Sequence, residues 1–296
     1  MTSCLLIVNP SSGSEKANRY VKPMVMKLAT IFDKVEVKET QKAFDATVFS
    51  KEAADAGVTA VFCMGGDGTV NETINGLVQA KHQPAFGFIP LGTVNDLARA
   101  LKIPLKPSRA IDMLDTAKLV SIDIGRVNDR CFTNGVAIGT LSEAIVEVSA
   151  AEKTRLGSLA YFIKGMQALK EQKVYDFKIE TGEEAICVKS SLIIVSLTNS
   201  LGSFEKFMPG AGVADGKMRL VIFKEFELFD TAKIIAKLLS GHLGKSKLVT
   251  VKPVRQVKIT VAGNEPLSTN VDGDRGPELP LEIEVLPSYL QVYAPQ

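Results

Sequence analysis

The stretch Cys63-Met64-Gly65-Gly66-Asp67-Gly68-Thr69-Val70-Asn71-Glu72 decides the fold of this chain. The apolar run that leads into it, residues 59–64, is typical of a buried parallel strand, and a helical pattern follows. A strand, a glycine turn and a helix start present backbone N–H groups to an anion, and glycine lets a phosphate approach closely. Paired glycines alone would equally suit a plain turn. Because a carboxylate beside a phosphate requires a metal or a transferable proton, Asp67 favours the phosphate end of a nucleotide site.

Composition limits the class of protein. The 296 residues suffice for one large domain or two ordinary ones, and 46% of them are apolar, which allows a sizeable core. The formal net charge of +2 gives no electrostatic indication of nucleic-acid binding. The four cysteines are widely spaced, which favours reduced core cysteines in a cytosolic protein over disulfides or a zinc site. We find no signal peptide and no apolar stretch near ~18 residues, so we expect a soluble chain or one peripheral to a membrane.

The first half of the chain alternates strand and helix patterns, with strands expected at residues 4–8, 34–38, 59–64 and 84–89. This alternation predicts a parallel sheet covered by helices on both faces. The first strand ends at Asn9–Gly13 and the fourth at Leu91–Asp96, and ligands of such sheets bind beyond the carboxyl ends of the strands. Asn95 and Asp96 would equally serve as plain caps of the next helix. The ends of the third and fourth strands each carry glycine, threonine and aspartate, and they are nevertheless expected to converge on one crevice.

The second half changes character after a predicted helix at residues 104–118. From about residue 123, short strand patterns with turn residues between them predict an antiparallel, sandwich-like domain. Two helical patterns interrupt the strands, at residues 156–173 and 228–239. The second is amphipathic enough to cover a sheet or to touch a membrane, and covering a sheet is the favoured interpretation.

Three segments in order, Asn9–Gly13, Gly65–Glu72 and Leu91–Asp96, resemble the diacylglycerol kinase-type lipid kinases, which include bacterial lipid kinases, diacylglycerol kinases and sphingosine kinases. The glycine–aspartate turn alone is shared with NAD kinases and, more distantly, phosphofructokinases, whereas the three segments at these spacings are specific. The resemblance covers nearly the whole chain. It implies an α/β, doubly wound ATP-binding domain at residues 1–122 and a β-rich lipid substrate domain at 123–286, with a last strand, about 287–296, that returns to the first domain.

Two later segments also match this family. Ala214–Met218 matches a structural magnesium site, which the resemblance assigns to the Asp215 carboxylate and the main-chain carbonyls of Gly212 and Lys217. One carboxylate is chemically adequate, because magnesium retains several waters. Asn270–Asp274 matches the segment that carries the general base. Since Asp-Gly is also a strong hairpin-turn signal, each segment alone would suit a plain turn.

The general base is ambiguous, because the family pattern is Asp-Gly-Glu and this chain has Asp272-Gly273-Asp274. On an extended segment, both side chains would point to the same side, whereas Gly273 also permits a sharper turn in which both face the crevice with different roles. Asp272 is favoured because it matches its position unchanged, whereas Asp274 is one methylene shorter than the family's glutamate. The departure leaves open which of the two accepts the hydroxyl proton.

The resemblance therefore implies an ATP-dependent lipid kinase that uses Mg²⁺. Phosphoryl transfer depends mostly on positioning and charge neutralisation, so magnesium near Asp67, Asp96 and Asp123 would supply much of the chemistry. A second departure is Ser14, where some bacterial relatives have lysine, so Lys16 or Arg19 would supply phosphate charge instead. ATP is expected in the crevice between the domains, held by Asn9, Pro10, Ser11, Ser12, Gly13, Thr40, Gly65, Gly66, Asp67, Gly68, Thr69, Val70, Asn71, Glu72 and Thr93.

Two other functions stay open at this point, an NAD kinase and a non-catalytic nucleotide-binding regulator on the same scaffold. The expected partners are a lipid substrate and a peripheral membrane surface, without nucleic acid, and a homodimer is left open. The expected location is the cytoplasm, with peripheral membrane association and a role in phospholipid synthesis. Diacylglycerol, a sphingoid base, a monoacylglycerol or a polyprenol would each offer the required hydroxyl.

Overall fold

The computed structural model describes residues 1–15, 17–139, 173–202, 207–208, 210–224, 228–263, 267 and 269–295. The chain divides into two compact units, one comprising Met1–Ile122 with Ser288–Gln296 and the other Asp123–Pro287. Both boundaries fall inside long strands, β5 (Lys118–Val127) and β15 (Leu281–Ala294), so each of these strands contributes residues to both units. Residues 156–172 of the helix predicted above lie outside the described part of the chain.

The first unit is built on a parallel sheet. β1 (Ser3–Val8) lies between β2 (Lys34–Glu39) and β3 (Ala60–Gly65), and β4 (Ala85–Pro90) follows beside β3. Every residue of β3 is buried, as expected for a strand that is apolar on both faces. β15 returns to this sheet and runs parallel to β4, with Val292 opposite Phe86.

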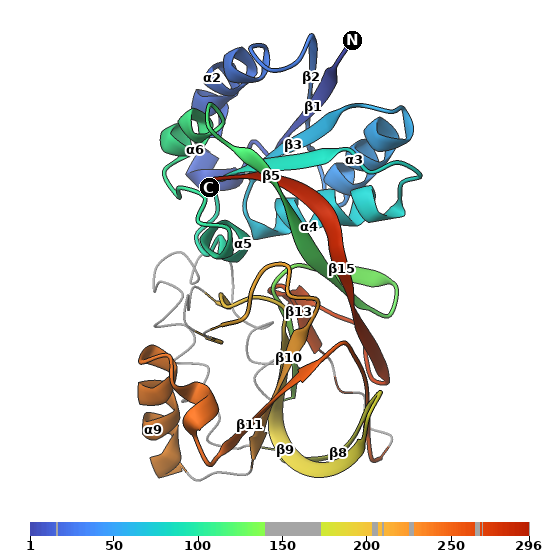
Figure 1. Cartoon of the computed structure of the whole chain (residues 1–296), viewed down its shortest axis with the longest axis vertical. Helices are drawn as coiled ribbons and strands as arrows, with labels where there is room; N and C mark the ends of the chain where they lie inside the picture. The colour runs from blue at the N-terminus through green and yellow to red at the C-terminus, as the bar shows by residue number, and fades with distance from the viewer. Residues whose placement is uncertain are drawn as a thin grey trace. The chain divides into compact units, whose positions relative to one another are not determined.

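Helices cover both faces of this sheet. Figure 1 shows α3 (Asp45–Asp55) and α4 (Asp67–Gln79) together on one face, and α2 (Asn18–Leu28) and α6 (Pro107–Met113) on the other. Two short helices, α1 (Ser12–Glu15) and α5 (Asp96–Ala100), follow the ends of β1 and β4. The doubly wound arrangement is therefore confirmed. The helix predicted at residues 104–118 is shorter than expected, because the chain turns at Met113 and soon enters β5.

The second unit is an antiparallel β structure. β7 (Gly135–Gly139) and β8 (Tyr175–Thr181) flank β9 (Ala185–Ser196), and β10 (Met218–Lys224) lies between β9 and β11 (Val249–Val254). β12 (Gln256–Val261) joins β8 to β15, and β13 (Thr269–Val271) pairs with β7 and with β14 (Asp274–Arg275). The short β6 (Arg130–Phe132) pairs with β5. This architecture confirms the β-sandwich-like second domain.

Two apolar clusters stabilise the second unit from opposite faces of β9 and β10. One includes Phe132, Phe177 and Leu220 and is enclosed by the curved strands seen in Figure 1. The other lies under α9 (Leu228–Leu239), from which Ile234 and Leu238 are buried against it. A short 3-10 helix, η2 (Leu243–Lys245), lies in the connection between α9 and β11. The amphipathic segment predicted at residues 228–239 thus covers a sheet.

Candidate functional site

The glycine turn and the turn after β4 lie side by side in the first unit. β3 ends at Gly65, Gly66 is extended, and α4 begins at Asp67. A Cβ atom on Gly66 would lie 3.2 Å from the Cα of Gly92, so both backbones need the missing side chain to approach this closely. The α4 N-terminus adds its free N–H groups and positive dipole end at the same place. This edge of the sheet is suited to bind an anion.

The Asp67 carboxylate joins the two turns. One of its oxygens accepts a hydrogen bond from the backbone N–H of Asn95 at 2.8 Å, and the other accepts from the N–H of Asp96 at 2.9 Å. The pKa of Asp67 is raised to about 6, mainly by burial and also by the nearby Asp96 carboxylate, while the two N–H donors partly oppose the shift. A cation beside Asp67 and Asp96 would relieve this unfavourable charge, so these two carboxylates fit a divalent metal ion.

Asn95 shapes the second turn in an unexpected way. It precedes α5 in the left-handed conformation, with φ of 53°, and its side chain makes no capping hydrogen bond. Instead, its Oδ1 accepts from the Gly92 N–H at 3.0 Å and its Nδ2 donates to the Gly92 carbonyl at 2.7 Å. Asn95 therefore occupies the N-cap position of α5, but its side chain bonds to Gly92 instead of capping the helix. Asp96 is buried as the first residue of α5.

The end of β1 is tied to the glycine turn. The Nδ2 of Asn9 donates to the hydroxyl of Thr69 at 3.0 Å, and its Oδ1 accepts from the N–H and hydroxyl of Ser11. The N–H of Thr40 donates to the Val8 carbonyl at 2.9 Å, which places Thr40 next to Asn9. The structure thus brings together the ends of β1, β2, β3 and β4, which carry the predicted nucleotide-binding residues. Lys16 and Arg19 were suggested to supply the phosphate charge that a lysine at position 14 supplies in some relatives. Arg19 is exposed on α2, and Lys16 lies outside the described residues.

We expect Gly66→Val to weaken nucleotide binding by roughly tenfold or more, because overpacking a tight contact costs about 1–3 kcal/mol. The added side chain would push against Gly92 and separate the two turns. Titration calorimetry with ATP measures the affinity directly. Gly244→Ala in the second unit is the control, since a Cβ there makes only an ordinary 3.6 Å contact with Val251. Unchanged ATP affinity in Gly66→Val would argue against phosphate binding at this turn.

The raised pKa of Asp67 predicts a pH dependence of stability. Since the folded pKa of about 6 lies above the ordinary value of 3.8, the folded protein holds this proton more tightly than the unfolded chain. The contribution of Asp67 to folding stability should therefore increase as the pH falls from 7 toward 4. Replacement by asparagine removes the titration, so the melting temperature of wild type should rise relative to that of Asp67→Asn over the same range. A difference that stays constant from pH 7 to pH 4 would contradict the raised pKa.

Asp272 lies in a tight hairpin of the second unit. The Asp272-Gly273 pair forms the two-residue turn between β13 and β14, and both residues have positive φ, at 51° and 96°. One carboxylate oxygen of Asp272 accepts from the N–H and hydroxyl of Thr133, and the other accepts from the N–H groups of Asn134 and Gly135, at 2.7–3.1 Å. Burial raises the pKa of Asp272, and these backbone donors partly oppose the rise.

Asp274 differs from Asp272 in its surroundings. Of the two conformations left open for these residues, the structure has the turn, because the chain reverses between them and Asp274 pairs with Val271 across the hairpin. The Asp274 side chain is 62% exposed and lies 3.2 Å from the guanidinium of Arg130. The raised pKa favours Asp272 over Asp274, which pairs with arginine, and Asp272 must release one of its four hydrogen bonds to accept a proton. The preference for Asp272 therefore stays a prediction with a physical basis.

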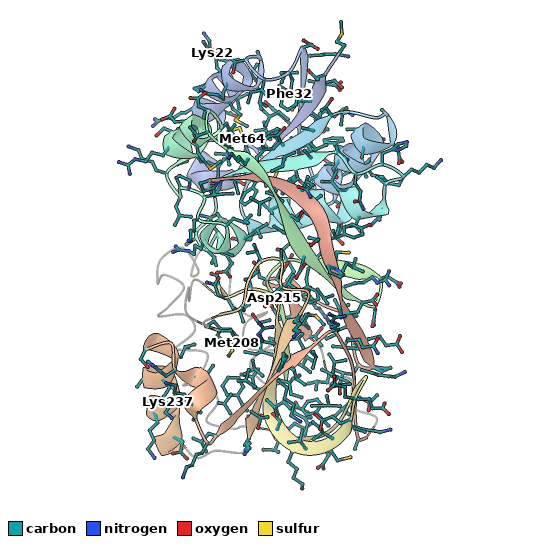
Figure 2. All side chains as sticks on the ribbon, viewed as in Figure 1. Lys22, Phe32, Met64, Met208, Asp215 and Lys237 are labelled. Atoms are coloured by element: carbon teal, nitrogen blue, oxygen red, sulfur yellow. The ribbon has the colours of Figure 1, made fainter. Side chains whose placement is uncertain are left out.

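Asp123 and Asp215 hold the loop that precedes β10, where Figure 2 labels Asp215. Asp123 is buried at the start of the second unit, donates its N–H to the Val213 carbonyl at 2.7 Å and accepts from the Gly216 N–H at 2.7 Å. Asp215 accepts from the N–H groups of Gly212 and Lys217 and contacts the guanidinium of Arg219 at 2.5 Å.

These loop residues do not fit a structural magnesium ion. Arg219 already contacts the Asp215 carboxylate and also donates to the Lys217 carbonyl at 3.4 Å, and these are two of the three oxygens that the resemblance assigned to the metal. The sequence interpretation did not include Arg219. A basic residue four positions after a loop aspartate is the signal that could have revealed it.

The chain matches two family models along its length. Residues 3–127 match the diacylglycerol kinase catalytic domain, and residues 135–294 match the YegS C-terminal NAD kinase beta sandwich-like domain. A diacylglycerol kinase of Staphylococcus carnosus is 35% identical over 291 residues, covering 98% of this chain and 94% of the relative. A diacylglycerol kinase of Staphylococcus saprophyticus is 33% identical over 290 residues, covering 98% and 94%.

Solved structures show the same fold. The crystal structure of a diacylglycerol kinase from Bacillus anthracis superposes with a TM-score of 0.79 at 24% identity and covers 99% of this chain and 96% of that one. The family matches define the class of protein, a phosphotransferase of the kinase type. With the matches to both halves, the chain belongs to the diacylglycerol kinase-type lipid kinase family.

Proposed function

We propose that this protein transfers the γ-phosphoryl group of ATP to a hydroxyl group of a lipid such as diacylglycerol. The observation that carries the proposal is the Asp67 carboxylate, which joins two glycine turns at the N-terminus of α4. Backbone N–H groups of the glycine turn bind the phosphates, and the Asn9–Thr69 hydrogen bond fixes the neighbouring turn. Family membership supports the lipid as acceptor.

In the proposed reaction, the lipid hydroxyl oxygen forms a bond to the γ-phosphorus, the bond from that phosphorus to the bridging oxygen breaks, and ADP leaves. Asp272 accepts the hydroxyl proton, and burial raises the pKa of its carboxyl group, which favours proton acceptance. When bound with ATP, Mg²⁺ would neutralise charge on the phosphates, and Asp67 and Asp96 are the residues that would hold it. A catalytic role of Asp123 stays a prediction. Its carboxylate accepts a hydrogen bond from the Gly216 N–H in the loop before β10.

A lipid acceptor requires access to a bilayer or micelle surface, so peripheral membrane association forms part of the proposal. No helix of the described residues is long and apolar enough to cross a membrane. The cytoplasmic location, the role in phospholipid synthesis and a homodimer stay predictions. Sedimentation with lipid vesicles would test the membrane association separately from catalysis.

The function is tested with ATP labelled at the γ-phosphate and a panel of acceptors in mixed micelles. The panel comprises diacylglycerol, a monoacylglycerol, a sphingoid base and a polyprenol, with NAD in solution as the nucleotide acceptor. We expect label in one lipid class and none in NAD. Label in NAD would favour an NAD kinase, a class worth testing because residues 135–294 match an NAD kinase beta sandwich-like domain. ATP binding without transfer to any acceptor would favour a non-catalytic regulator.

A further inference from the structure

The loop before β10 contacts a positive charge of the protein itself, the guanidinium of Arg219 in β10. Its residues 212–217 are drawn together by the Asp215 carboxylate, whose two oxygens offer about four acceptor positions. One oxygen accepts from the Gly212 N–H at 3.3 Å and from the Arg219 guanidinium at 2.5 Å, so its two positions are used. The other accepts from the Lys217 N–H at 3.0 Å. A metal ion would find one acceptor position left on this carboxylate, beside a fixed positive charge.

The backbone of Arg219 is held in the middle of a sheet. In β10 it lies opposite Ser196 of β9 on one side and opposite Pro253 of β11 on the other. Its side chain is only 16% exposed and that of Asp215 is 29% exposed, so the ion pair is shielded from water more than an ordinary surface pair. The planar guanidinium reaches both the Asp215 carboxylate and the Lys217 carbonyl with separate nitrogens, which a point charge could not do.

The same loop is fixed from its other side by Asp123. The N–H of Asp123 donates to Val213 and its carboxylate accepts from Gly216, both at 2.7 Å. Two carboxylates, those of Asp123 and Asp215, thus bond to the loop. A positive charge is needed beside Asp215 to balance its partly shielded negative charge. Arginine stays protonated at any pH of interest, so this charge is permanent.

We propose that the Arg219 guanidinium takes the place of a structural magnesium ion in this loop, so that the folded second unit needs no metal for its stability. In this protein, a requirement for magnesium then arises only at the nucleotide. Chelation would stop phosphoryl transfer without loosening the fold. The stability part of this inference does not depend on the proposed function, because thermal unfolding is measured without substrate.

The test is thermal unfolding of the full chain without nucleotide, in excess Mg²⁺ and in excess EDTA. We expect the wild-type melting temperature to be the same in both. Arg219→Met should lower it by about 2–6 °C in EDTA, because the Asp215 charge loses its partner. Added Mg²⁺ should recover part of that loss in Arg219→Met, because the freed carboxylate and carbonyl become available. The matched control is Arg255→Ala, which removes an exposed arginine of the same unit and should leave the melting temperature unchanged.

Two further variants keep the test decisive. Arg219→Lys keeps the charge and loses the planar fork, so its melting temperature should lie between wild type and Arg219→Met, and it serves if the methionine variant does not fold. Repeating the EDTA measurement on Asp67→Asn removes any change in melting temperature that comes from metal bound at the nucleotide site of the first unit. A chelator effect that disappears in Asp67→Asn belongs to the nucleotide end and agrees with a metal-free loop. A wild-type loss of several degrees in EDTA that persists in Asp67→Asn would overturn the proposal, as would an Arg219→Met variant with wild-type stability.

Discussion

Asp67→Asn is expected to lose turnover by roughly a thousandfold, since a bound metal ion supplies several kcal/mol to the transition state and each ~1.4 kcal/mol is worth a factor of ten. The carboxylate lies at the junction of two glycine turns, beside Asp96, where a divalent cation would be held. The melting temperature should change little at pH 7. The amide loses one of two hydrogen bonds to backbone N–H groups but removes a charge that burial makes unfavourable.

Steady-state turnover with ATP and lipid in micelles, beside thermal unfolding, measures both parts of this prediction. Asp112→Asn is the matched control, because Asp112 is an exposed carboxylate on α6 of the same unit and its loss should leave turnover unchanged. Wild-type turnover in Asp67→Asn would remove the basis of the proposed nucleotide site. A large fall in melting temperature together with lost turnover would show a structural role instead.

Asp272→Asn is expected to lose turnover by roughly a hundredfold or more, the usual scale for losing a positioned base, while ATP affinity changes little. Stability should also fall, because the carboxylate accepts from Thr133, Asn134 and Gly135 and the amide must turn its NH₂ group toward one set of these donors. Leaving such groups unpaired costs about 1–3 kcal/mol. Turnover must therefore be measured well below the melting temperature and expressed per folded molecule, with the folded fraction followed by circular dichroism.

Asp274→Asn is the matched comparison for Asp272→Asn. Its carboxylate is exposed and its pair with Arg130 is a surface ion pair, worth little to stability. We expect wild-type stability and a small loss of turnover. If Asp274→Asn abolishes turnover while folded Asp272→Asn remains active, the two roles are reversed. If both remain active, neither residue is the base.

The strands of the first unit could be predicted because their signals are local. The apolar run at residues 59–64 corresponds to β3 within one residue at each end, since a strand buried on both faces must be continuously apolar. The glycine turn was equally visible, because only glycine permits the close approach between Gly66 and Gly92. The amphipathic spacing at residues 228–239 predicted α9 for the same reason.

The connections within the sites could not be predicted, because they depend on distant partners. Asp67 binds N–H groups 28 and 29 residues later in the chain, and Asp272 binds N–H groups 137 to 139 residues earlier. No local pattern specifies such pairs. Arg219 was missed for a different reason, since its partner Asp215 is near in sequence, but resemblance had already assigned that carboxylate to a metal.

The central claim is that this protein moves the γ-phosphoryl group of ATP to a lipid hydroxyl. The most direct measurement is the transfer of label to diacylglycerol in mixed micelles, with ATP labelled in parallel samples at the γ- or the α-phosphate. We predict a labelled lipid phosphomonoester from the γ-labelled sample alone, with wild-type protein and not with Asp67→Asn. Absence of any labelled lipid from wild-type protein, across all four lipid classes and with ATP binding confirmed by calorimetry, would contradict the claim.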